Sequence, residues 1–273
     1  LISASAVIMA AGGGGRLFAR TNNTMDMTGD SFALALDAGA PLRDMEFIQF
    51  YPTRSIFPVH ANIPSPLFGE GAVLRNSHGE RFMTRYDTQV DMANRDVASR
   101  AIFSEVQAGC GVKDGVYMDL SAVPRASLEL KFPSTLKLLK THGIDPAKQW
   151  MIVSPVVHFI MGGVWIDSRC RTAIPGLFAA GEAAGGVHGA NRLAGNALTE
   201  TIVFGRKAGF EAASYAGRLR QLPQPPLTSL GMPPIRNGDV AVAEVKGQLR
   251  RALWSDVGLI RTKEGLLRGQ AAI

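Results

Sequence analysis

The sequence is poor in cysteine and has no long apolar run, and both shortages exclude whole classes of protein. It contains two cysteines, Cys110 and Cys170, which are too few for a disulfide framework or a four-cysteine metal site. No apolar stretch reaches the roughly 18 residues that a membrane helix needs, and the N-terminus lacks the basic flank and cleavage site of a signal peptide. We therefore expect no bound metal, no membrane-spanning segment and a reducing, cytoplasmic location.

A concentrated block of positive charge is also missing. The chain has 29 Lys and Arg against 23 Asp and Glu, a formal net charge of +6, but the basic residues are spread along its length and do not alternate with aromatic residues. This pattern argues against nucleic acid as a partner. An excess of positive charge then favours anionic small substrates or an acidic membrane surface.

Glycine is abundant, yet the usual dinucleotide-binding fingerprint does not occur. The stretch "AVIMAAGGGGR" (residues 6–16) is a short apolar run followed by four glycines. A Gly-x-Gly-x-x-Gly motif that began with Gly12 and Gly14 would need a third glycine at the position of Leu17. The residues alone therefore favour a plain glycine turn over a nucleotide site, although such a turn lets the backbone approach an anion closely.

The order of the predicted elements indicates an α/β chain of two domains. The 273 residues, 46% of them hydrophobic, suffice for a large core. Residues 31–40 have the apolar spacing of a helix, and residues 44–53 alternate as a strand does. From about residue 53 Pro, Gly and turn signals are frequent, and residues 94–109 then form an amphipathic pattern. We interpret this part as an inserted α+β domain.

The second half returns to strands, glycine turns and a long helix. A strand at 177–180 ends in a Gly-rich loop, and a helix begins near Asn196. Small residues recur along that helix and predict a close approach to a sheet or a flat ligand, although tight packing alone explains them equally well. They are Gly205, Gly209, Ala213 and Ala216. A Pro-rich linker at 223–234 precedes a further helix at 242–253.

Polar side chains gather in "AAGEAAGGVHGANRLAGNAL" (residues 179–198), where a packed loop does not need them. Glu182 directly follows a strand-end glycine, the place from which acidic residues bind a ribose diol in dinucleotide sites. The helix that begins near Asn196 directs its dipole and free N–H groups at this loop, which favours an anion or an electron-rich ring edge. The remaining polar residues are His188, Asn191 and Arg192.

Motifs along nearly the whole chain occur in the order of one known family. They are "AVIMAAGGGGRLF", "TGD", "AGAPLRDMEFIQFYPT", "GEG", "NRDVASRA", "HFIMGGVWID", "GLFAAGEAAGGVHGANRLAGNALTETIVFGR" and "LWSDVGLIRTKEGL". The chain thus resembles the flavoprotein subunits of the succinate dehydrogenase and fumarate reductase family, FAD-dependent oxidoreductases that include L-aspartate oxidase.

The resemblance implies an α/β FAD-binding domain of Rossmann-like type, interrupted by an α+β capping domain that closes over a dicarboxylate. The FAD-binding domain is expected at 1–50 and 155–220, the capping domain at 51–154, and a linker with the start of a C-terminal helical domain at 221–273. The first strand and Gly-x-Gly-x-x-Gly motif of the family do not occur in the sequence. We therefore expect a fragment that lacks the N-terminal segment binding the FAD pyrophosphate.

The resemblance also implies roles for individual residues. Arg95 is the proton-transferring arginine, and His158 and Arg192 bind the substrate carboxylate. The residues expected to contact FAD are Ala11, Gly12, Gly13, Asp30, Glu182, Asn196, Ala197 and Leu198. Arginine suits planar, bidentate recognition of a carboxylate. Hydride transfer at flavin N5 needs an acid or base at the neighbouring carbon, although an arginine, with a pKa of about 12 or above, is a weak acid.

Departures from the family pattern bear on the substrate. Tyr51 stands where the family has a histidine that helps to bind a carboxylate, and Pro64 and Ser65 replace a Thr-Glu pair that holds the second carboxylate. Because a tyrosine can donate one hydrogen bond, we include Tyr51 among the substrate-binding residues. Ala197 replaces a serine, a mild change since the expected contact comes from the backbone.

The function implied is the interconversion of succinate-like and fumarate-like acids by hydride transfer at flavin N5. The alternatives are an L-aspartate oxidase-like or other acid dehydrogenase, and a catalytically incompetent fragment or relative. The implied electron partner is an iron-sulfur subunit or another carrier, which would bring the protein to the inner face of the membrane.

Overall fold

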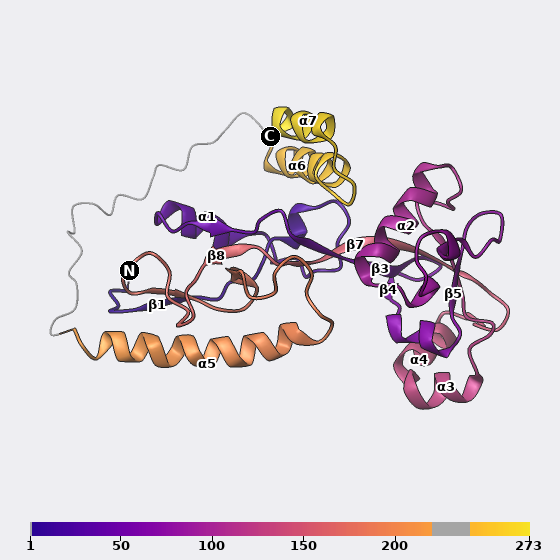
Figure 1. The fold of residues 1–273 in the computed structure, drawn as a ribbon, viewed down its shortest axis with the longest axis horizontal. Helices are drawn as coiled ribbons and strands as arrows, with labels where there is room; N and C mark the ends of the chain where they lie inside the picture. Colours follow the sequence, from indigo (N-terminus) through magenta and orange to yellow (C-terminus); the bar gives the residue numbers. More distant parts are fainter. Residues whose placement is uncertain (1, 220–240) are drawn as a thin grey trace.

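The computed structural model describes residues 2–219 and 241–273, which form two lobes and a C-terminal pair of helices (Figure 1). Two long strands, β3 (Ile48–Phe57) and β7 (Met151–Ile160), run from one lobe into the other. Their backbones pair antiparallel from Ile48 opposite Ile160 to Phe57 opposite Ile152. Side chains near the middle of these strands therefore lie at the junction of the lobes.

The first lobe contains two small sheets between helices. In one sheet β1 (Val7–Met9) pairs parallel with β9 (Leu177–Ala179), and in the other the order is β10 (Ala184–Gly185), β8 (Gly163–Trp165), β2 (Leu42–Arg43). The helices α1 (Asp30–Asp37) and α5 (Asn196–Ala216) lie on opposite sides of these strands (Figure 1). Small side chains such as Ala35, Val164 and Ala179 fill the core between α1 and the sheets, so the layers pack closely.

The second lobe has an antiparallel sheet of five strands in the order β4–β3–β7–β6–β5. The remaining strands are β4 (Ala61–Asn62), β5 (Val73–Arg75) and β6 (Val116–Asp119), and the helices are α2 (Arg95–Gln107), α3 (Arg125–Lys131) and α4 (Pro133–Thr141). The largest apolar cluster lies here and includes Leu74, Phe82 and Ile102, none of which is exposed to solvent. This lobe therefore has a core of its own.

The C-terminal helices α6 (Val242–Asp256) and α7 (Lys263–Ala272) pack against the junction of the lobes. Trp254 of α6 meets Phe50 of β3 edge to face, with ring centres 6.1 Å apart. Short 3-10 helices complete the secondary structure at Gly15–Leu17, Ser65–Glu70, Phe82–Arg85, Val90–Met92 and Gly181–Ala183. None of the helices in the described ranges is long and apolar enough to cross a membrane.

Most elements expected from the sequence form close to their predicted places. The helices expected at 31–40 and 94–109 are α1 and α2, and the strand expected at 177–180 is β9. The expected strand at 44–53 begins only at Ile48, because Asp44 adopts a positive φ and the chain turns there. The expected domain boundaries at 50/51 and 154/155 fall inside β3 and β7, and the Pro-rich linker lies outside the described residues.

Of the expectations for the small residues of α5, a close approach to the sheet is wrong for its glycines, whereas contact with a flat ligand stays a prediction. Ala208 and Ala212 of α5 pack in one cluster with Phe178 of β9, and the ring of Tyr215 meets that of Phe178 edge to face, with ring centres 6.2 Å apart. A Cβ added at Gly205 or Gly209 would meet nothing within 4 Å in the part of the chain that the structure describes. The alanine face therefore makes the close approach to the sheet, and the stripe of glycines points elsewhere.

Candidate active site

The glycine loop and Glu182 meet at the edge of the first lobe. Because β1 and β9 are parallel, their carboxyl ends lie side by side, and the chain leaves β1 into Gly12 and Gly13 and leaves β9 into Glu182. A Cβ added at Gly13 would collide with the Glu182 carboxylate. Carboxyl ends of parallel strands are where α/β sheets bind ligands. At position 13 only glycine leaves room for the Glu182 carboxylate.

Glu182 is held in an environment that favours its neutral form. One carboxylate oxygen, Oε1, accepts a hydrogen bond from the backbone N–H of Ile160 at 2.9 Å. Burial raises the pKa of Glu182 to about 7, against the lowering effects of this hydrogen bond and of Arg192. Glu182 thus links the end of β7 to the glycine loop, and near neutral pH its carboxyl group can also donate a hydrogen bond.

The N-terminus of α5 lacks a side-chain cap, and the first N–H, of Asn196, donates to the carbonyl of Leu193 at 3.3 Å. Gly195 precedes the helix in the left-handed conformation, with φ of 88°, and no side chain caps the first turn. Asn196 and Leu198 are exposed, and Ala197 is half-buried. A long helix with an uncapped N-terminus favours a negatively charged or electron-rich group, so the geometry fits the expected contact with a flavin.

The other expected cofactor contacts lie around the glycine loop. Asp30 is the exposed first residue of α1, and its carboxylate accepts a hydrogen bond from Thr28 Oγ1 at 2.5 Å. The N–H of Gly29 donates to the carbonyl of Gly13 at 3.0 Å, which ties the start of α1 to the loop. Ala11 is exposed directly before the glycines. These residues and Glu182 form one surface suited to a large, partly anionic cofactor.

Three expected substrate residues come together at the junction of the lobes. Arg95 is the first residue of α2, and its guanidinium carbon lies 5.0 Å from the centre of the Tyr51 ring. The ring of His158, on β7, is centred 5.3 Å from that of Tyr51, on β3. The Tyr51 hydroxyl, however, donates to the carbonyl of Ile63 at 2.7 Å. Because the hydroxyl hydrogen is already bonded within the chain, Tyr51 presents the face of its ring to this group and not the expected hydrogen-bond donor.

Arg192 is almost completely buried beside this group, with 6% of its surface exposed. Its guanidinium lies over the ring of Phe159 at 4.6 Å, and Nη2 donates to Gln49 Oε1 at 2.7 Å. Nε is buried and has no partner within the described residues. Since an unpaired buried donor is costly, this atom indicates a missing acceptor.

The electrostatics of the group favour an anion. Burial lowers the pKa of Arg192, and the positive charge of Arg95 lowers it further. Burial also lowers the pKa of His158 to about 4, with added repulsion from Arg192 and Arg95, so His158 is neutral at pH 7. Neither arginine forms an ion pair with a carboxylate anywhere in residues 2–219 and 241–273. Two cations that form no ion pair with a carboxylate in the described part of the chain are suited to bind one.

Gln49 and Asp96 are residues of the site that do not stand out in the sequence. Gln49 bonds Arg192 twice, through Oε1 to Nη2 and through Nε2 to the backbone carbonyl at 2.6 Å. Asn191 donates to Asp96 at 3.2 Å and so joins the Gly-rich loop to α2. Gln49 is a polar residue inside the apolar β3 strand, and this feature of the sequence could have indicated a role in the site. The hydrogen bond between Asn191 and Asp96 depends on tertiary structure alone.

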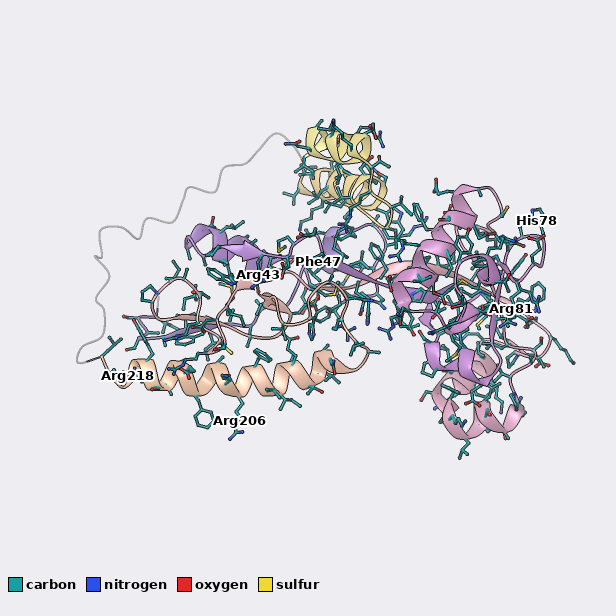
Figure 2. The ribbon with its side chains drawn as sticks, viewed as in Figure 1. Arg43, Phe47, His78, Arg81, Arg206 and Arg218 are labelled. Carbon is teal, nitrogen blue, oxygen red and sulfur yellow. The ribbon has the colours of Figure 1, made fainter. Side chains whose placement is uncertain are left out.

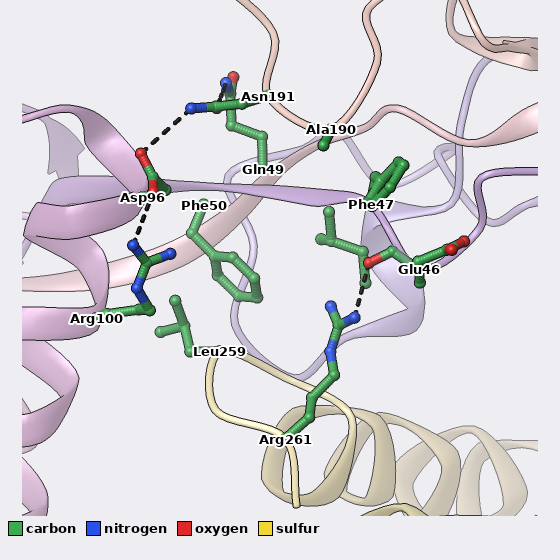
Figure 3. Close-up of a pocket in the computed structure, with 11 residues that line it drawn as sticks. Glu46, Phe47, Gln49, Phe50, Asp96, Arg100, Ala190, Asn191, Leu259 and Arg261 are labelled. Carbon is green, nitrogen blue, oxygen red and sulfur yellow. Dashed lines mark hydrogen bonds and ion pairs between the residues drawn. The ribbon is translucent and has the colours of Figure 1, made fainter.

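A pocket of about 340 Å³ lies behind the site, between β3, α2 and the C-terminal helices (Figure 3). In this view Asn191 bonds Asp96, which in turn bonds Arg100 at 2.8 Å. On the other side Arg261 donates to the carbonyl of Glu46 at 2.8 Å. These contacts join the two lobes and the C-terminal pair around the substrate residues.

The remaining residues singled out in the sequence lie near these groups. His188 and Glu200 form a buried pair, with Nε2 and Oε2 2.7 Å apart. Pro64 precedes the 3-10 helix that begins at Ser65, and the buried Ser65 hydroxyl has no partner within the described residues. Arginines labelled in Figure 2, such as Arg43, Arg81 and Arg206, are scattered over both lobes and form no single basic face.

The chain is similar in sequence to known proteins. Residues 1–198 match the family described as FAD binding domain. A fumarate reductase (CoM/CoB) chain of Methanothermobacter marburgensis is 43% identical over 272 residues, which cover 96% of this chain and 50% of that protein. An L-aspartate oxidase of Caulobacter vibrioides is 40% identical over 273 residues, covering 98% and 50%. The chain thus spans about half the length of these relatives.

Solved structures share the fold. The FrdA chain of an E. coli quinol fumarate reductase superposes with a TM-score of 0.84 at 31% identity, covering 98% of this chain and 50% of that one. Sdh1 of Mycobacterium smegmatis gives 0.81 at 37% identity, covering 98% and 47%. Sequence and fold together define the class of protein as a flavoprotein with an FAD-binding domain.

The chain belongs to the FAD-binding family of fumarate reductase and succinate dehydrogenase flavoproteins. The family, the α/β fold class and the FAD cofactor predicted from the sequence are confirmed.

Proposed function

We propose that the protein of which this chain is part interconverts a succinate-like acid and its α,β-unsaturated counterpart. The observation that supports this most is the pair Arg95 and Arg192, which lie close together beside His158 without a carboxylate partner in the described part of the chain. The relative named as a fumarate reductase, at 43% identity, supports the same substrate class.

Different residues of this chain bind the substrate and the cofactor. Arg192 binds one carboxylate of the acid, because its guanidinium is fixed by Gln49 and stacked on Phe159 while Nε remains unpaired. His158 borders the same space. The glycine loop, Glu182 and the N-terminus of α5 hold FAD, which supplies or accepts a hydride at N5 when bound. A buried, preorganised arginine costs little to reorganise during the reaction.

Arg95 moves the proton that accompanies the hydride. Reduction of the double bond adds one hydride to one carbon and one proton to the other, and oxidation removes both. Arg95 stands at the N-terminus of α2 on the side of the second lobe, and it is half-buried, so its guanidinium can regain a proton from water. A positioned proton donor of this kind contributes roughly 10²–10⁴-fold to the rate.

Replacing Arg95 by Gln in the complete protein tests this assignment. We expect fumarate reduction and succinate oxidation to fall by about 10²–10⁴-fold, since the amide cannot supply the proton. The matched control is Arg125→Gln on α3 of the same lobe, where an exposed ion pair with Glu129 is lost at a cost below about 1 kcal/mol. Undiminished turnover in R95Q would exclude the proposed role.

Oxidation of L-aspartate or a related acid is the second candidate. The changes at Tyr51, Pro64 and Ser65 alter one end of the expected dicarboxylate site, and the Caulobacter vibrioides relative at 40% identity is an L-aspartate oxidase. Dye reduction with a panel of succinate, L-aspartate and 2-hydroxy acids separates the candidates. A protein that reduces dye with L-aspartate only would favour this second function.

We further propose a partner that carries electrons, an iron-sulfur subunit or an equivalent, which would place the protein at the inner face of the membrane. The support is the likeness to FrdA and Sdh1 chains. Co-purification of the full-length protein from its native cells, followed by identification of bound subunits and their iron content, tests this.

A further inference from the structure

A string of polar side chains runs from His158 to the surface, and its first member is Asn22. Asn22 Oδ1 lies 3.1 Å from His158 Nδ1. Asn22 Nδ2 in turn donates to Asn62 Oδ1 at 3.1 Å, and Arg54 Nη1 donates to the same oxygen at 3.0 Å. The string therefore ends on a cation at the far side of β3 and β4.

That cation determines the direction of every hydrogen bond in the string. A guanidinium has donors only, so the atom of Asn62 that it contacts is the amide oxygen. The atom of Asn22 that meets the same oxygen must then be its NH₂ group, which leaves Oδ1 of Asn22 facing His158. Because Oδ1 only accepts, Nδ1 of His158 carries the hydrogen.

The backbone holds Asn22 and His158 in this relation. Asn22 N donates to the carbonyl of Val157 at 3.2 Å, and the Asn23 side chain donates to the carbonyl of His158 at 2.8 Å. Both anchors lie on β7, directly beside the imidazole. The backbone of Asn22 is thus fixed to the strand that carries His158.

We propose that Asn22 is a positioning residue that holds His158 in the tautomer with its hydrogen on Nδ1 and so makes Nε2 a hydrogen-bond acceptor. The groups facing His158 are Arg95 from α2, Arg192 from the loop before α5, and Tyr51 from β3. The two cations oppose a second proton on the ring, and Nε2 makes no hydrogen bond among the described residues.

This inference rests on the proposed function for its meaning in substrate binding. A carboxylate cannot donate to Nε2, so an unsubstituted dicarboxylate would be held by Arg192, while His158 joins only by taking up a proton. An acid with a hydroxyl or amino group offers a hydrogen to Nε2 directly. The Asn22–His158 pair would then set the preference among acids.

The experiment is a nuclear magnetic resonance measurement of the imidazole nitrogens in protein labelled with ¹⁵N-histidine. The chain has five histidines, and the His158 signals are those lost in His158→Gln. At pH 7 we expect the wild type to show hydrogen on Nδ1 and none on Nε2. Asn22→Leu should release the ring and populate the Nε2–H tautomer. Asn22→Asp should raise the midpoint of His158 titration by about 1–3 pH units, because a carboxylate then faces Nδ1.

Asn62→Asp is the charge-matched control. It adds the same negative charge one step along the string, and its carboxylate still accepts from both Arg54 and Asn22, so the His158 tautomer should stay unchanged. Hydrogen on Nε2 in the wild type, or an unchanged tautomer in folded N22L, would overturn the inference. If N22L does not fold, the wild-type spectrum alone decides. No turnover is measured, so a failure of the proposed function remains distinguishable.

Discussion

At the scale of single residues, the candidate site depends on one absent side chain and one buried carboxyl group. Gly13 leaves the space that the Glu182 carboxyl group occupies, and Glu182 also accepts from the N–H of Ile160. The loop after β1, the loop after β9 and the end of β7 are therefore joined through a single side chain. The position of each of these three segments therefore affects the binding of a cofactor that lies across this surface.

Gly13→Ala tests this dependence. The added Cβ must displace the Glu182 carboxylate, and overpacking of this kind costs about 1–3 kcal/mol. We expect FAD affinity to fall by roughly tenfold to a hundredfold, measured by flavin fluorescence titration of the flavin-free protein. Gly209→Ala is the matched control, because a Cβ there meets nothing within 4 Å in the described ranges. Equal FAD affinity in G13A and G209A would contradict the requirement for glycine at position 13.

At the scale of elements, α5 connects the stability of the first lobe to the cofactor site. Its middle packs on β9 through Ala208 and Ala212 against Phe178, and its first turn has no side-chain cap and faces the site. Alanine is required at this contact because a longer side chain would push the helix away from the strand. A shift of α5 there would also move its N-terminus relative to the glycine loop.

Ala208→Leu tests the contact between α5 and β9. Ala208 is completely buried, so the extra atoms have no room, and we expect the free energy of unfolding to fall by about 1–3 kcal/mol. Ala213→Leu, at an exposed position of the same helix, should change it by less than about 0.5 kcal/mol. Urea unfolding followed by circular dichroism measures both. Similar losses in the two variants would show that helix propensity, and not this contact, is responsible.

At the scale of the whole molecule, two partly buried groups give opposite responses of stability to pH. His158 has its pKa lowered from 6.5 to about 4, so its contribution is complete above 6.5 and is lost as the pH falls through 4. Glu182 has its pKa raised from 4.5 to about 7, so its contribution is complete below 4.5 and is lost as the pH rises through 7. Between 4.5 and 6.5 the two slopes oppose each other.

Replacing one group should therefore expose the effect of the other. In Glu182→Gln we expect the free energy of unfolding to rise with pH across this window, by up to about 1.4 kcal/mol per pH unit relative to the wild type. In His158→Gln it should fall with pH by a similar amount. The measurement is urea unfolding of the flavin-free chain at about pH 5 and about pH 6. The exposed His60→Gln serves as the control and should follow the wild type.

The sequence by itself determined the family, the fold class and most element positions. Long helices such as α2 and α5 follow from local periodicity, and the Gly-rich segments around Glu182 and Arg192 predict the cofactor and substrate ends of the site. These features are local in the chain, so neighbouring residues carry the information. The same local information mispredicted the packing face of α5, because small residues show where close approach is permitted and not where a partner lies.

Only the tertiary structure decided how the site residues act together. In the folded chain the Tyr51 hydroxyl donates to the carbonyl of Ile63, and Gln49 bonds Arg192. The guanidinium of Arg54, on β3, determines the orientation of the Asn22 amide. The tertiary structure also sets the protonation of His158 and Glu182. Each of these depends on desolvation or on a partner distant in the chain, and such energies arise only when β3, β7, α2 and the Gly-rich loop meet at the junction of the lobes.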